Sequence, residues 1–147
     1  MFHISDKTID IAAAYKSMQL EEAGGFVAFE GWVRNHNEGK TVKSLEYEIY
    51  HSMALKEGNK LLEEALERFD IHKAVCIHRE GHLELGDVAV YVACASSHRA
   101  AAFEACQFII DKLKVRLPIW KKEHYTDGDS GWVECEQCAK HGHKHNH

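Results

Sequence analysis

Hydrophobic residues between Ser96 and Lys122 recur at three- and four-residue steps, which predicts an amphipathic helix over residues 96–117. The serines at the start of this stretch can cap the free backbone N–H groups of the first turn. Pro118 ends the helix because proline lacks an N–H donor and disfavours helical geometry in the residue before it. A strand with two lysines is predicted to follow over residues 119–125. The predicted inward stripe of the helix consists of Phe103, Cys106, Ile110, Leu113 and Leu117.

The rest of the chain shows strand and helix patterns interspersed. Two of the predicted strands, residues 26–33 and 88–96, are apolar on both faces, so we expect both to be buried within a sheet. Several connections are too short for crossovers between parallel strands, which favours an α+β fold with a mixed, largely antiparallel sheet and amphipathic helices. The remaining predicted strands are residues 2–5, 42–50, 71–80 and 132–135, and residues 81–87 are predicted to be a connection. Helices are predicted over residues 10–20 and 51–69, the second capped by Ser52 with Leu55, Leu62, Leu66 and Phe69 inward.

Length and composition indicate one domain. A chain of 147 residues with 45% hydrophobic content can bury a single core, which we assign to residues 1–134. The net charge of −5 argues against a general nucleic-acid binder but permits a local basic pocket. The longest apolar run, residues 88–95, is too short to span a bilayer, so no membrane association is expected. Cys76, Cys94 and Cys106 lie in apolar segments, as reduced buried thiols do, and this indicates a cytoplasmic protein.

Residues 135–147 form a separate tail rich in cysteine and histidine. Its thiols and imidazoles are ligand types that zinc prefers, and the candidate metal ligands are Cys135, Cys138, His141 and His143. Histidines two residues apart in a polar segment also occur in tails that hold no metal. One alternative for the whole chain is therefore a small metal-binding module that acts through this tail.

Basic residues stand at the ends of several predicted elements. Lys114 lies in the last turn of the long helix, where a cation stabilises the helix dipole without any ligand. His98 and Arg99 lie in the first turn, where a cation is unfavourable unless an anion binds there. Arg34 follows a strand, and Lys121 and Lys122 follow Pro118. Each has a structural explanation by itself, but together they indicate a pocket for a phosphorylated or carboxylated ligand.

Four stretches that contain these residues resemble, in order and spacing, the large catalytic subunit of molybdopterin synthase, the MoaE family. They are FEGWVRNHNEG from Phe29, IHREGHLELGD from Ile77, SSHRAAAFEACQFIIDKLKVRLPIWKKE from Ser96, and GWVE from Gly131. The resemblance covers residues 2–135 and implies an α/β hammerhead-type fold. It also implies a central homodimer within a heterotetramer, in which a small ubiquitin-like sulfur-carrier subunit inserts its C-terminal Gly-Gly thiocarboxylate.

The activity that this resemblance implies is conversion of cyclic pyranopterin monophosphate into molybdopterin, a step of molybdenum cofactor biosynthesis. Lys114 and Lys121 match the family's catalytic lysines. Further substrate-binding positions implied are Trp32, Val33, Arg34, His98, Arg99, Lys122 and Glu123. The carrier delivers the sulfur, so no cysteine of this chain is needed as a nucleophile and no cofactor is expected, apart from zinc in the tail. A pure interaction subunit would instead tolerate loss of both lysines.

Helix arithmetic adds an expectation about assembly. His98 and Lys114 are sixteen residues apart, and at about 1.5 Å per residue they lie roughly 24 Å apart along one helix. That distance is too long for both residues to contact one small ligand. We therefore predict a homodimer in which each active site takes its helix start from one chain and its lysines from the other.

Overall fold

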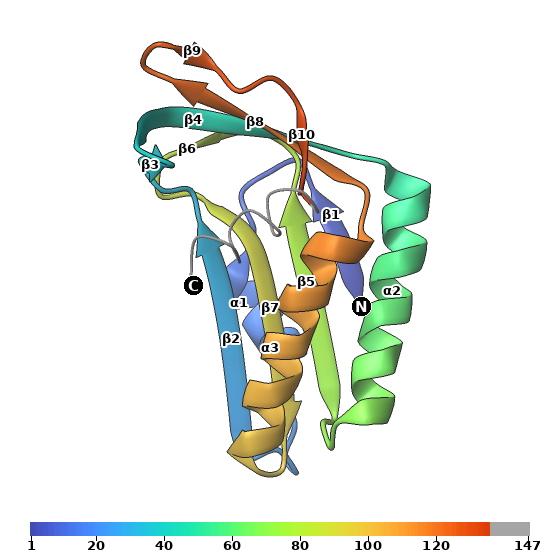
Figure 1. The fold of residues 1–147 in the computed structure, drawn as a ribbon. Helices are drawn as coiled ribbons and strands as arrows, with labels where there is room; N and C mark the ends of the chain where they lie inside the picture. The colour runs from blue at the N-terminus through green and yellow to red at the C-terminus, as the bar shows by residue number, and fades with distance from the viewer. Residues whose placement is uncertain (136–147) are drawn as a thin grey trace.

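The computed structural model describes residues 1–135, which form two β-sheets and three helices (Figure 1). The four-stranded sheet has the order β1 (Phe2–Ser5), β5 (Lys73–Arg79), β7 (Val88–Ser96), β2 (Gly25–Trp32). The second sheet has the order β10 (Val133–Glu134), β8 (Ile119–Tyr125), β4 (Lys40–Ile49), β3 (His36–Asn37), with β6 (Gly81–Glu84) paired to β4 and β9 (Gly128–Asp129) to β8. The helices are α1 (Ile11–Ser17), α2 (His51–Arg68) and α3 (Arg99–Arg116).

Strand directions confirm the predicted mixed, largely antiparallel α+β fold. Only β1 and β5 pair in parallel among the described strands, and every other pair is antiparallel. Alternate residues of β7 face opposite sides. Val92 and Cys94 contribute to a core with α2 and α3, whereas Tyr91 and Ala93 pack with α1. None of the helices in residues 1–135 is long and apolar enough to cross a bilayer.

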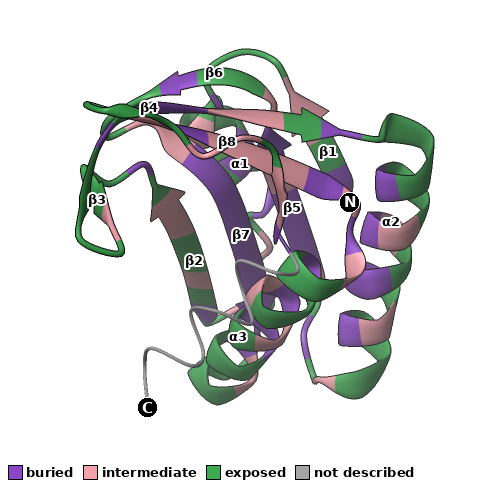
Figure 2. Cartoon of the chain, turned by 45° about the horizontal axis from the view of Figure 1, so that its top comes forward, coloured by how far each residue is buried: buried purple, intermediate pink, exposed green. Residues whose placement is uncertain are grey.

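The prediction that residues 26–33 are buried on both faces is wrong. β7 is buried along almost its whole length, but β2 lies at the edge of the sheet and carries exposed side chains (Figure 2). Phe26 and Phe29 are 39% and 41% exposed. An apolar sequence pattern does not distinguish a central strand from an edge strand whose face is free to meet another chain.

The predicted inward stripes of the two long helices are only partly correct. In α3, Cys106 and Leu113 are buried as predicted, but Phe103 is 60% exposed and the buried face is completed by Ala102, Ala105 and Ile109. In α2, Leu62 is buried, Leu55 and Leu66 are exposed, and the inner face includes Ala54, Gly58, Leu61 and Ala65. Small residues line these faces because neighbouring groups approach the helix backbone closely. For example, a Cβ atom at Gly58 of α2 would lie 2.3 Å from the ring of Phe2.

Three local predictions are also wrong. Helix α2 begins at His51 with Tyr50 at its N-cap, and α3 begins at Arg99 with His98 at its N-cap, so neither has a serine cap. Ser96 instead donates its hydroxyl to the carbonyl of His98. The connection predicted at residues 81–87 contains strand β6, whose backbone pairs with β4.

Candidate active site at the junction of the two sheets

Strand β8 presents charged residues on both of its faces. It begins directly after Pro118, and strand alternation places Lys121 and Glu123 on one face and Lys122 on the other. The Lys122 ammonium lies 4.8 Å from the centroid of the Trp132 ring, within the range of a cation–π contact. The inward face, with Lys121 and Glu123, is the one directed toward the four-stranded sheet.

A buried carboxylate links the cations of this inward face. Glu123 is 6% exposed, and its Oε1 lies 3.3 Å from the Nζ of Lys121. Asn37 donates its side-chain amide to the same oxygen at 2.7 Å, and Arg34 donates to Asn37 Oδ1 at 3.4 Å. A buried carboxylate is tolerated only when it is paired and hydrogen-bonded, and here it holds Lys121 close to the segment that contains Arg34.

Lys114 reaches the same neighbourhood from the last turn of α3. His78, a buried residue of β5, packs its ring edge against Tyr47 at a centroid distance of 4.8 Å. Tyr47 is the cross-strand partner of Lys121, and the charge of Lys114 acts on His78. Lys121 therefore lies next to Tyr47, and Lys114 lies close enough to His78 for its charge to act on that ring.

His78 is neutral at pH 7. Its pKa is lowered to about 4, chiefly by burial and to a smaller extent by the charge of Lys114, against the raising effect of the hydrogen bond to the Arg79 carbonyl. That carbonyl lies 2.7 Å from Nδ1, so Nδ1 carries the proton and donates it to the carbonyl oxygen. The ring is thus uncharged, packs against Tyr47 and lies within the influence of the Lys114 charge.

Other predicted residues lie away from this cluster. Val33 is 4% exposed and packs with Leu45 and Leu83, so its side chain belongs to the core. Trp32 is exposed at the end of β2 and donates its indole N–H to Glu30 at 2.9 Å. His98 and Arg99 are exposed at the start of α3, a full helix length from Lys114, so one chain does not bring the two groups together.

The predicted metal ligands of the tail divide into two groups. Cys135 is 9% exposed and forms part of the main core, so it packs with the compact domain. The remaining candidates, Cys138, His141 and His143, lie outside the described residues.

Sequence reasoning missed three members of the site: Asn37, Tyr47 and His78. Asn37 follows Arg34 in a polar stretch, and its position soon after a predicted strand was the available signal. Tyr47 and His78 fit the apolar and alternating pattern of ordinary strand residues, and only the pairing of β4 with β8 and the packing of β5 place them beside the lysines.

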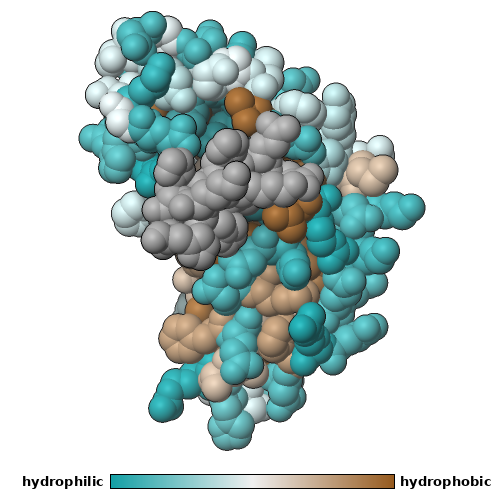
Figure 3. Space-filling model, viewed as in Figure 1, coloured by the Kyte–Doolittle hydropathy of each residue, from teal (hydrophilic) through white to brown (hydrophobic). Residues whose placement is uncertain are grey.

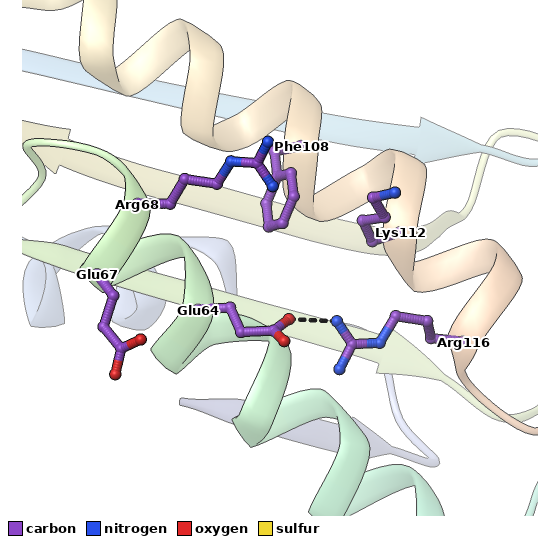
Figure 4. A pocket seen from close by; sticks show the side chains of 6 residues that line it. All are labelled: Glu64, Glu67, Arg68, Phe108, Lys112 and Arg116. Atoms are coloured by element: carbon purple, nitrogen blue, oxygen red, sulfur yellow. Dashed lines mark hydrogen bonds and ion pairs between the residues drawn. The ribbon is translucent and has the colours of Figure 1, made fainter.

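The groove between α2 and α3 is a different kind of pocket. Its volume is about 430 Å³, and it is lined by Glu64, Glu67, Arg68, Phe108, Lys112 and Arg116 (Figure 4). Arg116 pairs with Glu64 and, at 3.3 Å, with Glu57, and the hydrogen bond from Arg116 lowers the pKa of Glu64. Its charges largely neutralise one another, so the groove offers less to an anion than the junction of the sheets does.

The fold is α+β, with lysines, an arginine and a buried carboxylate at the junction of its two sheets, and the comparisons specify the family. Residues 4–116 match the family model described as MoaE protein, and the chain belongs to this family. The molybdopterin synthase catalytic subunit of Dictyostelium discoideum is 38% identical over 148 residues, covering 98% of this chain and 94% of the relative.

Solved structures agree with this assignment. The crystal structure of molybdopterin synthase from Staphylococcus aureus superposes with a TM-score of 0.83 at 34% identity, covering 88% of this chain and 94% of the other. A complex of subunits 1 and 2 of the molybdopterin-converting factor from Helicobacter pylori gives a TM-score of 0.72 at 21% identity, with 87% of each chain covered, and shows the shared fold.

Proposed function

We propose that this chain is the catalytic subunit of a molybdopterin synthase. In this reaction it transfers sulfur from the thiocarboxylated C-terminus of a small ubiquitin-like carrier subunit to cyclic pyranopterin monophosphate, and is thus a sulfurtransferase. Membership of the MoaE family supports the proposal, as does the curated function of its relatives. The structural observation behind it is the cluster of Lys121, buried Glu123, Asn37 and Arg34 beside Lys114.

The two lysines suit the charges of the reactants. The substrate carries a cyclic phosphate and the carrier tail an anionic sulfur, so both are attracted to ammonium groups held in place before they arrive. Negative charge develops as the phosphodiester ring opens, and a lysine can stabilise this charge or supply a proton. Glu123 fixes Lys121 in position, which limits the reorganisation needed during the reaction.

The cysteines of the described domain are poorly suited to act as nucleophiles. Burial raises the pKa of Cys94 to about 12 and that of Cys106 to about 11, and Cys76 shifts in the same direction. All three are therefore protonated at neutral pH. In the proposed reaction the carrier supplies the sulfur, so the chain needs no thiolate, metal or other cofactor for the transfer. Buried cysteines without disulfides also agree with the cytoplasmic location that we propose.

We further propose that the chain forms a homodimer with shared active sites. The edge strand β2 and helix α3 expose Phe29 and Phe103, and apolar surface gathers over this region of the molecule (Figure 3). A second copy is the occupant that completes the site, because it would bring a His98 and an Arg99 to lysines that lie at the other end of α3. A carrier subunit bound to each protomer gives the heterotetramer.

The test is reconstitution. The purified chain is mixed with thiocarboxylated carrier and cyclic pyranopterin monophosphate, and molybdopterin is measured. Carrier with an ordinary carboxylate terminus is the negative control, and Lys112→Ala is the matched lysine control, because Lys112 lies on α3 in the groove with α2. We expect product from the wild type and from Lys112→Ala. No product with active carrier and intact substrate would refute the proposed function.

A further inference from the structure

Three potential metal ligands converge on the outer face of the second sheet, away from the proposed active site. They are Glu46 of β4, His82 of β6 and His124 of β8, and one ligand atom from each lies within 4.8 Å of the other two. The strands that hold them are adjacent, with β4 between β6 and β8 (Figure 1). The active-site residues Lys121 and Glu123 face the opposite side of β8.

Strand register accounts for the convergence. Glu46 is directly opposite His82 on one side and Lys122 on the other. His124 is two residues after Lys122, so its side chain emerges on the same face. Leu45 and Leu83 point to the other face and are buried in a core cluster, which fixes the orientation of β4 and β6. The positions of the three ligands are therefore set by paired backbone and not by mobile loops.

Side-chain contacts already bring these groups together. His124 Nε2 lies 2.9 Å from Glu46 Oε1, and the rings of His82 and His124 have centroids 6.2 Å apart. Glu84 Oε1 lies 3.0 Å from His82 Nε2 and adds a second carboxylate beside the cluster. Surface histidine–carboxylate pairs are common. However, two independent pairs would not by themselves place one ligand atom from each of three strands within one small volume.

We propose that Glu46, His82 and His124 bind a divalent transition-metal ion, with zinc as the best match. Two imidazoles and one carboxylate form a ligand set that zinc accepts, and three protein ligands leave a fourth position for water. Ligands about 2.1 Å from zinc in a tetrahedron lie about 3.4 Å apart, so separations of up to 4.8 Å need only side-chain rotation. The ion would tie β4, β6 and β8 together on the face opposite Lys121.

The test measures metal binding at this site in a chain that lacks the metal ligands of the tail. The full-length chain is prepared with Cys138→Ser and with His141, His143, His145 and His147 each changed to Asn, which removes the tail ligands beyond Cys135. Zinc binding is measured by calorimetry and cobalt binding by visible absorption. We expect one ion per chain and a cobalt spectrum without sulfur-to-metal charge transfer. Zinc at about 100 times its dissociation constant should raise Tm by about 5–10 °C.

Single substitutions then identify the ligands. His82→Gln, His124→Gln and Glu46→Gln should each weaken binding at least about 10-fold and remove the rise in Tm. His51→Gln is the matched control, because within residues 1–135 the exposed pair of His51 and Glu80 has no third ligand, and this variant should bind as the parent does. Circular dichroism confirms folding, and Glu46→Gln preserves side-chain shape if a histidine variant fails to fold. Absence of saturable binding in the parent, or equal affinity in the parent and the folded variants, would overturn the proposal.

Discussion

Mixing two inactive variants tests whether one active site draws on two chains. His98→Ala removes the cation at the start of α3, and Lys121→Ala removes the lysine of β8. Helix α3 runs unbroken through 18 residues from Arg99 to Arg116, so His98 and Lys114 lie about 24 Å apart at about 1.5 Å per residue. Lys121 lies beside the Lys114 end, so a substrate that contacts both substituted positions must bridge two protomers.

The expected recovery follows from counting sites. Random exchange between equal amounts of the two variants gives about half mixed dimers. Each mixed dimer has one site with both substitutions and one site with neither, so one of its two sites is intact. Activity should therefore rise from near zero to about a quarter of wild type, whereas a site within one chain would give no recovery.

The assay is molybdopterin formation with thiocarboxylated carrier in excess, measured before and after subunit exchange. Exchange is verified independently by mass spectrometry of a protomer that carries a distinguishing label. A control mixture of Lys121→Ala with Lys114→Ala should stay inactive, because both lysines lie at the same end of α3 and no mixed site has both. Proven exchange without recovery for the His98 and Lys121 pair would refute the shared site.

Three further outcomes follow from the structure. Lys121→Ala should fold normally and lose nearly all turnover. Lys121→Arg should also be impaired, because arginine keeps the charge but does not give up its proton. Reconstitution assays measure turnover of both variants, and circular dichroism checks that they fold. As the pH falls from about 6.5 to about 4, the free energy of unfolding should decrease by up to about 3 kcal/mol, because the lowered pKa of His78 means that the unfolded chain binds the proton first. Denaturant melts should show this dependence on pH, and His78→Gln should make it weaker. Replacing Cys138, His141 and His143 together should leave turnover unchanged, whereas loss of activity with the fold intact would favour the metal-binding alternative.

Periodicity predicted most element positions but not which helix face is buried. The predicted inner face of α3 included Phe103, which is exposed. It left out Ala102 and Ala105, which are buried, because a hydrophobicity pattern favours large apolar residues over small ones. Helices pack closely where residues are small, as Gly58 does against Phe2, and a hydrophobicity pattern underestimates such faces. The large residues left outside, including Phe103, lie on surface that we assign to a second chain.

The lysines were predicted because charges at element ends stand out in a sequence, whereas their supporting residues depend on long-range pairing. The contact between Asn37 and Glu123 joins residues 86 positions apart, and that between Glu46 and His124 joins residues 78 apart. No local pattern encodes such pairs. They arise when register is fixed by burial of Leu45 and Leu83 beneath the second sheet.

Strand β8 connects the two proposed sites through its alternation. Pro118 ends the preceding helix and Ile119 is buried, so the strand starts with a defined face inward. With that start, Lys121 and Glu123 point to the junction, and Lys122 and His124 point outward toward Trp132 and Glu46. A one-residue slip would exchange the two sets and leave the Glu123 carboxylate without Asn37. Because Glu123 is buried, losing that hydrogen bond is costly, so the contacts that orient Lys121 also select the register that assembles the outer cluster.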